Sequence, residues 1–206
     1  MSIRDFYLDA ASAFVKLVTQ IPDSMWSAPG LGEWTIQDLV GHANRSLTLV
    51  STYLTGPPPQ NEALLDPASY FVLAMASMGD PIGVAQRGRD AGSALGSSPV
   101  TVVRDCFSTV SSIVAGNPDD ADSQFIRVPV GVMTLDGYLA TRIVELVVHG
   151  DDLGRALGLA SEPGNGAVTV ALKILSQLSV LRSDPLLVLR ALTGRAALDK
   201  GFSVLG

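Results

Sequence analysis

A helix start signal recurs along this chain: a residue with an oxygen-bearing side chain is followed directly by proline. The side chain can accept hydrogen bonds from the free amides at a helix N-terminus, and proline fits the first helical position because it has no amide hydrogen to lose. The signal occurs at Asp66-Pro67, Asp80-Pro81, Ser98-Pro99 and Asp184-Pro185. Two capping boxes, Ser2 with Asp5 and Thr35 with Asp38, mark two further helix starts.

Between these signals, apolar residues recur at helical spacing. The pattern predicts helices near residues 3–20, 35–55, 67–78, 81–95, 99–116, 134–158, 164–181 and 185–193. The run from Gly56 to Pro59 ends the second helix, and Pro129 makes residues 124–133 a strand-like connector. A parallel sheet needs repeated strand-helix alternation, which the sequence does not show. We therefore predict an all-α fold, in one domain over residues 1–206 that ends in a short helix and tail from about 185 to 206.

The composition excludes several classes of function. The chain has 206 residues, a net charge of -6 and 14 Lys and Arg in total, which is a poor match for the phosphates of nucleic acid. The most apolar stretch, residues 167–181, is interrupted by Lys173 and Gln177, so we expect no membrane span. The single cysteine, Cys106, excludes an internal disulfide and fits a reducing compartment. We therefore expect a cytoplasmic protein that binds neither nucleic acid nor membrane.

The two histidines of the chain form the most informative pattern. Glu145 and His149 are four residues apart in a predicted helix, so their side chains share one helix face. His42 lies two turns into the second predicted helix. Two histidines and one carboxylate from two helices are the ligand set of an open metal site, suited to zinc and also to Fe(II) or Ni(II). A glutamate and a histidine at this spacing can also be a local ion pair, so both interpretations stay open at this point.

Residues beside this set have two interpretations each. Asp152 can orient His149 as a hydrogen-bond acceptor, or it can pair with Arg155. Arg142 can face an anionic substrate, although an ordinary ion pair with Glu145 on the helix face is favoured.

Other residues have structural interpretations. Trp34 is expected to pack where the second helix begins, and Asp38 is expected to cap that helix. The four-residue spacing of Gly88, Gly92 and Gly96 favours close helix packing. With no histidine near it in sequence, Cys106 is expected to be a small core residue.

Two spaced elements carry a family resemblance. The stretch from Glu33 to His42 resembles the W-[ST]-x-x-[DE]-L-x-x-H element of the DinB/mycothiol-dependent maleylpyruvate isomerase superfamily. Residues 141–158 resemble its second element, R-x-x-E-x-x-x-H-x-x-D-x-x-x-A-x-G, and residues 189–196 are similar to the end of its short actinobacterial members. The resemblance implies an up-down-down-up four-helix bundle that binds a divalent metal. His42, Glu145 and His149 match the family's ligand positions, and Asp152 matches the aspartate of the second element; zinc is the expected metal, with nickel or iron as alternatives.

The resemblance also implies a chemistry. Some members couple the metal to mycothiol or another low-molecular-weight thiol, whose pKa the metal lowers. We therefore expect a thiol-dependent transferase or isomerase that acts on a small electrophile, and the family analogy favours a homodimer. The isomerase has a separate C-terminal α/β domain where this sequence predicts a helix and tail, so no residue is carried over from it. No acid or base is identifiable beyond the ligands, which leaves a non-catalytic metal-binding or small-molecule-binding or sensing protein as the alternative.

Overall fold

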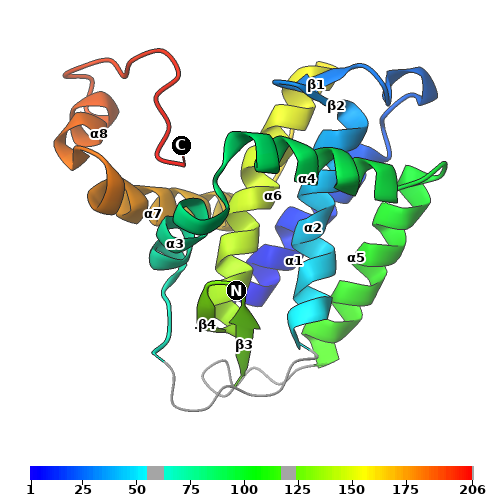
Figure 1. Ribbon diagram of the computed structural model, residues 1–206, viewed down its shortest axis with the longest axis horizontal. Coiled ribbons are helices and arrows are strands. Elements are labelled where there is room, and N and C mark those ends of the chain that lie inside the picture. The colour runs from blue at the N-terminus through cyan, green and yellow to red at the C-terminus, as the bar shows by residue number, and fades with distance from the viewer. Residues whose placement is uncertain (55–62, 117–123, 206) are drawn as a thin grey trace.

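The computed structural model describes residues 1–54, 63–116 and 124–205, and it is helical apart from two small hairpins (Figure 1). Its helices are α1 (Ile3–Val18), α2 (Ile36–Leu54), α3 (Pro67–Met78), α4 (Pro81–Ala94), α5 (Pro99–Gly116), α6 (Leu135–Leu157), α7 (Asn165–Arg182) and α8 (Pro185–Leu192), with a 3-10 turn, η1, at Asp23–Met25. The eight predicted helices are confirmed, each end within two residues. The run from Gly56 to Pro59, which was predicted to end α2, lies outside the described residues.

Two antiparallel hairpins complete the fold. Residues predicted to be extended form β3 (Phe125–Val128) and β4 (Gly131–Thr134), which pair with each other and turn at Pro129 and Val130. The other hairpin, β1 (Pro29–Leu31) with β2 (Trp34–Thr35), was not predicted. Its strands have three and two residues, too few to show the alternation that identifies a strand in a sequence. Neither hairpin joins a larger sheet in the described chain, so the all-α prediction is confirmed.

The caps predicted at Ser2, Thr35, Asp66, Asp80 and Asp184 are formed. The hydroxyl of Ser2 accepts from the Asp5 amide at 3.2 Å, while the Ser2 amide donates to the Asp5 carboxylate at 2.7 Å. Thr35 and Asp38 make the same reciprocal pair where α2 begins, with N···O distances of 3.0 and 3.1 Å. Asp66, Asp80 and Asp184 accept from amides of α3, α4 and α8, each with proline in the first turn. These caps explain why the ends of the helices could be located from the sequence.

Four of the helices, α1, α2, α5 and α6, form the bundle. Helix α6 packs against α1 and α2, and α5 packs against the same two helices. In Figure 1, α1 and α6 run upward while α2 and α5 run downward, which is the predicted up-down-down-up order. The interior is filled by large side chains from these helices, among them Tyr7, Phe14, Leu39, Leu47 and Leu139, all at most 2% exposed. The core therefore fixes α2 and α6 side by side, and these two helices carry the candidate site.

Helix α4 crosses α2 very closely, because glycines remove side chains from the contact. A β-carbon at Gly41 would collide with the backbone of Gly92, one at Gly92 would collide with Asp38, and one at Gly88 would collide with the Trp34 ring. The predicted packing role of Gly88 and Gly92 is thus confirmed. Gly96 is different: it has φ +61° just after α4 and faces open space, so it serves the turn.

The remaining helices lie outside the bundle. Helix α3 packs against α7, and α8 continues from α7 at the edge of the molecule (Figure 1). In the described part of the chain, no single helix combines the length and apolarity of a membrane span; α3 and α4 meet that test only as a pair, bent by 99°.

Candidate metal centre

The bundle brings the three predicted ligands together. Glu145 and His149 project from one face of α6, one turn apart, and His42 faces them from α2. The Glu145 Oε2 atom lies 3.7 Å from His42 Nε2 and 3.4 Å from His149 Nε2. One donor atom from each residue lies within 4.8 Å of the other two. We call His42, Glu145 and His149 the triad.

The spacing of the triad fits a metal ion. Zinc binds imidazole nitrogen and carboxylate oxygen at about 2.0–2.2 Å in tetrahedral geometry, which puts two ligand atoms about 3.4 Å apart. The two distances to Glu145 Oε2, 3.4 and 3.7 Å, match that separation closely. The two imidazole rings stand edge to face, with centroids 4.9 Å apart at 89°, so both Nε2 atoms can point at one centre. Three protein ligands leave a position for a further ligand.

The two imidazoles differ in what contacts their Nδ1 atoms. The Asp152 carboxylate lies 3.1 Å from His149 Nδ1, which favours the tautomer with Nε2 free to face the triad. Of its two predicted partners, Asp152 therefore contacts His149. The Nδ1 atom of His42 is buried and has no hydrogen-bond partner among the described residues. The ring of His42 is instead held by Trp34, whose ring centroid is 4.7 Å away.

The charges of the triad support one another. Burial opposes ionisation of Glu145, but hydrogen bonds from His149 and His42 hold the pKa of its carboxyl well below the usual range. Burial likewise opposes the charged form of His149, yet the hydrogen bonds to Asp152 and Glu145 raise its pKa to about 9. Burial lowers the pKa of His42, which keeps this imidazole neutral near pH 7. Without a metal, the triad is therefore a carboxylate between one charged and one neutral imidazole.

Arg142 does not have the predicted position on an open helix face. It is 6% exposed, and its guanidinium donates from Nη2 to the Tyr70 hydroxyl at 3.3 Å and from Nε to Thr141 Oγ1 at 3.1 Å. Its Cζ atom lies 4.8 Å from the ring centroid of Tyr138 and 5.5 Å from that of Tyr70. Rings on two sides thus take the place of the predicted ion pair with Glu145.

Trp34 and Cys106, which the sequence also pointed out, have packing roles. Trp34 is buried, donates from Nε1 to the Ala85 carbonyl at 3.0 Å, and so fastens the start of α2 to α4. Cys106 is half-buried, and its Sγ lies 3.6 Å from Asn44 Nδ2. The thiol contacts Asn44 and no triad residue in the described chain, so Cys106 has a packing role.

A pocket of about 210 Å³, the inner pocket, opens onto the triad. His42 and Glu145 line it together with three arginines, Arg45, Arg87 and Arg142. We call these three the arginine cluster. The cluster has no signature in the sequence, because its members come from α2, α4 and α6 and share no spacing. The only indication in the sequence was that Arg142 could either pair with Glu145 or face an anionic substrate.

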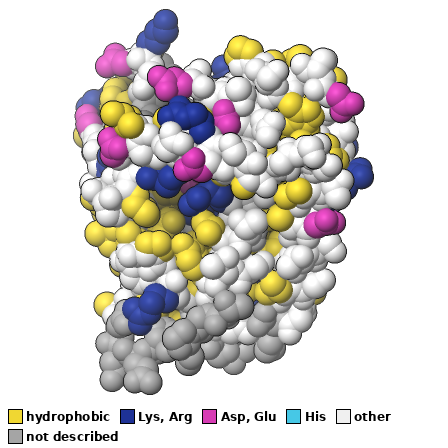
Figure 2. All heavy atoms as spheres, turned by 45° about the vertical axis from the view of Figure 1, so that its right-hand side comes forward, with side chains coloured by type: hydrophobic (Ala, Val, Ile, Leu, Met, Phe, Trp, Pro, Cys, Tyr) yellow, Lys and Arg dark blue, Asp and Glu magenta, His cyan; other side chains and the backbone are white. Residues whose placement is uncertain are grey.

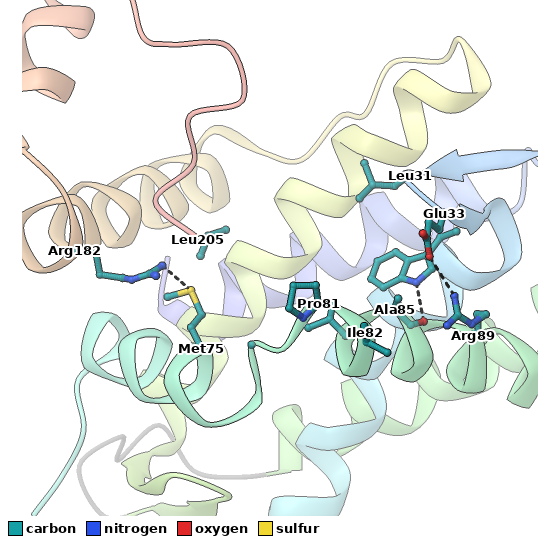
Figure 3. Close-up of a pocket in the computed structure, with 12 residues that line it drawn as sticks. Leu31, Glu33, Met75, Pro81, Ile82, Ala85, Arg89, Arg182 and Leu205 are labelled. Carbon is teal, nitrogen blue, oxygen red and sulfur yellow. Dashed lines mark hydrogen bonds and ion pairs between the residues drawn. The ribbon is translucent and has the colours of Figure 1, made fainter.

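A larger hollow of about 650 Å³, the outer groove, is lined by no triad residue (Figure 3). Figure 3 shows Leu31 and Glu33 at one end, Arg182 and Leu205 at the opposite end, and Pro81 and Ile82 of α4 between them. The outer groove shares Met75, Gly79 and Val84 with the inner pocket, so the two meet at the corner between α3 and α4. Of these two hollows, the smaller one is next to the triad, because His42 and Glu145 line it and neither lines the outer groove.

Comparison with known proteins agrees with this geometry. The family model described as the mycothiol maleylpyruvate isomerase N-terminal domain matches residues 7–154, which is 148 of 206 residues. The match contains the triad and Asp152, and it leaves α7 and α8 outside. No curated protein and no solved structure matches the chain. The family match covers well over half of the chain, and this chain therefore belongs to the mycothiol maleylpyruvate isomerase N-terminal domain family.

Proposed function

We propose that this protein binds one divalent metal ion through His42 Nε2, the Glu145 carboxylate and His149 Nε2, and that it is a thiol-dependent transferase or isomerase acting on a small electrophile. One observation carries the proposal: three donor atoms from two helices converge within 4.8 Å of one another beside a pocket. Membership of a family described by mycothiol supports a low-molecular-weight thiol of that kind as the co-substrate.

The residues around the triad have roles that follow from their contacts. A divalent metal bound there would supply positive charge that lowers the pKa of a thiol placed beside it. Asp152 accepts from His149 Nδ1 and so holds Nε2 towards the site. Leu49, Phe71 and Ala74 give the inner pocket apolar walls that exclude water from a reacting group.

Several finer predictions from the sequence are part of the same proposal. Zinc is the metal we propose, with nickel and iron as alternatives, since imidazole and carboxylate suit all three. A single domain over residues 1–206, a homodimer and a cytoplasmic location stay predictions.

A second candidate function is non-catalytic binding of a metal or small molecule, for storage or sensing. It is favoured by the side chains of the inner pocket. Apart from the triad, the ionisable groups lining it are arginines and tyrosines, and arginine does not give up its proton in proteins. A reaction that needs a general base would therefore have to take it from the substrate or from the triad itself.

The first test is metal content, measured by elemental mass spectrometry on untagged protein. We expect about one equivalent in the parent chain and loss of metal in His42→Ala and His149→Ala. Asp151→Asn is a matched control, because Asp151 is exposed on α6 and outside the triad. If the parent chain takes up no zinc, nickel or iron on reconstitution, the metal proposal fails.

The second test is thiol-dependent turnover. The metal-loaded chain is incubated with mycothiol and a panel of electrophiles, and the rate is compared with that of His42→Ala. Turnover that requires both thiol and triad supports an enzyme. A chain that binds metal but gives no rate above the variant belongs with the binding proteins.

A further inference from the structure

Helix α8 is apolar on all sides and yet has no buried residue. Seven of its eight residues are apolar, and Arg190 is the exception. Each of the other α-helices in the described chain buries some of its residues. A helix that is apolar all round is normally buried. The main contact of α8 within the chain is with α7, so most of its apolar surface lies open.

The open surface of α8 continues onto the end of α7. We define the α8 patch as five large apolar side chains with exposed fractions from 53 to 77%: Val180, Leu181, Leu186, Leu189 and Leu192. The three leucines of α8 recur every three residues, so they form one stripe along the helix. The other two side chains belong to the last turn of α7, and only Ser183 and Asp184 separate that turn from α8. The patch lies outside residues 7–154, the part of the chain that matches the family.

The rest of the described surface has no comparable concentration of apolar groups. The other large apolar side chains that are more than half exposed are Met1, Ile82 and Leu172, which are far apart in the sequence. Figure 2 brings forward the α5 side of the molecule, the side away from α8 in Figure 1, and there charged side chains of both signs lie among the apolar ones. The α8 patch is thus the place where a partner would remove most apolar surface from water.

The size of the α8 patch matches one side of a protein interface. Its five side chains expose on the order of 600 Å² of apolar surface, the upper end of the range of about 300–600 Å² for the largest patch of a typical monomer. A standard interface buries about 800 Å² on each partner, of which about 56–65% is apolar. The patch therefore supplies the whole apolar part of one partner's side.

The charges beside the patch favour a second protein surface over a lipid surface. Arg190 pairs with Asp184 at 3.8 Å, so α8 carries no excess of positive charge. Helices that lie on a membrane have a polar face rich in Lys and Arg, and α8 has no such face. The partner must itself be largely apolar, and a second copy of this chain brings the same patch. Two identical patches meet about a two-fold axis, in an interface that closes at two copies.

We propose that two copies of this chain associate through their α8 patches, with the leucine stripe of each α8 packed against its counterpart about a two-fold axis. The proposal gives the predicted homodimer its contact surface. No residue of the patch lines the inner pocket or belongs to the triad, so each copy keeps its own candidate metal centre. The contact is therefore independent of the proposed function, and association can be lost while metal binding is kept.

Sedimentation velocity of the full chain over a series of concentrations tests the interface. We expect the parent chain to sediment as a dimer. Leu189→Lys should weaken association about thirtyfold or more, the size of a hot-spot loss, because it puts two charges into an apolar contact. Leu192→Lys, at a side chain that is 77% exposed, repeats the test, and circular dichroism checks that each variant is folded. Ile82→Lys is the matched control, because Ile82 is 78% exposed on α4 and outside the patch, and it should leave the dimer unchanged.

Metal content measured on the same samples separates this inference from the metal proposal. A monomeric Leu189→Lys chain with the same metal content as the parent supports the interface, and so does a parent dimer that holds no metal. A parent chain that sediments as a monomer at every concentration overturns the interface. A dimer that both α8 variants leave intact, or that Ile82→Lys weakens equally, overturns it as well. Binding of a monomeric parent chain to phosphatidylcholine vesicles, lost in Leu189→Lys, would overturn it in favour of a lipid surface.

Discussion

The triad and the arginine cluster share one pocket but differ in how their charge is balanced. In the triad, a carboxylate lies between two imidazoles at 3.4 and 3.7 Å, and a second carboxylate supports one of them at 3.1 Å. In the arginine cluster, aromatic rings and neutral oxygens surround a buried cation. The charges of the first region are balanced by one another, whereas the buried cation of the second is surrounded by neutral groups. Variants should therefore separate the two, with triad changes lowering metal affinity and arginine changes leaving it unaltered.

The largest expected effect is on metal affinity when a triad residue is lost. We predict that His149→Ala lowers the affinity for zinc by at least about a hundredfold, which is the upper end of what loss of an outer contact causes. Competition with a fluorescent chelator measures it. Arg45→Met is the control, because Arg45 shares the pocket but supplies no donor atom to the triad. Equal losses in both variants would show that the two regions are not separable.

Metal affinity should also depend on pH, because a proton competes for His149. Its pKa of about 9 in the metal-free chain means that the imidazole is charged below that pH and must lose a proton to bind metal. The sign is thus positive: affinity rises with pH by up to about tenfold per unit and levels off above about 9. Zinc affinity measured from pH 6.5 to 9.5 tests this. A flat profile would show that His149 is already neutral in the free protein.

Loss of the Asp152 carboxylate, which contacts His149 Nδ1, should have a smaller effect on zinc affinity. Asp152→Asn should lower zinc affinity about tenfold at pH 9, the lower end for loss of an outer-sphere contact. Near pH 7 the loss should shrink, because removing Asp152 also lowers the pKa of His149 and weakens the competing proton. Asp151→Asn, the exposed neighbour, should change neither value. Equal effects of both substitutions on zinc affinity at pH 9 would show that Asp152 acts only through its negative charge and not through its contact with His149.

The two regions also differ in how far the sequence could predict them. Glu145 and His149 are one helical turn apart, so their shared face follows from spacing alone. That the helix of His42 packs beside them was predicted from the family resemblance. The N-caps at Ser2, Thr35 and Asp66 are local as well. The arginine cluster is not local: its three members meet because the glycines of α4 let that helix approach α2 closely. Side-chain direction across three helices depends on packing, which no single-chain spacing encodes.

The smallest expected effect is on the free energy of unfolding, when a tyrosine beside Arg142 loses its hydroxyl. The Tyr138 hydroxyl is buried without a hydrogen-bond partner among the described residues, whereas the Tyr70 hydroxyl accepts from Arg142 at 3.3 Å. Tyr138→Phe keeps the ring against the guanidinium and removes a hydroxyl that gains nothing, so the free energy of unfolding should stay the same or rise by up to about 1 kcal/mol. Tyr70→Phe removes a charged hydrogen bond and should lower it by about 1 kcal/mol, the low side of the range because the bond is long. Urea unfolding of the metal-free chain, followed by circular dichroism, compares the two. Equal destabilisation would mean that the Tyr138 hydroxyl is satisfied in solution, and the arginine cluster would then be better compensated than its contacts within the chain indicate.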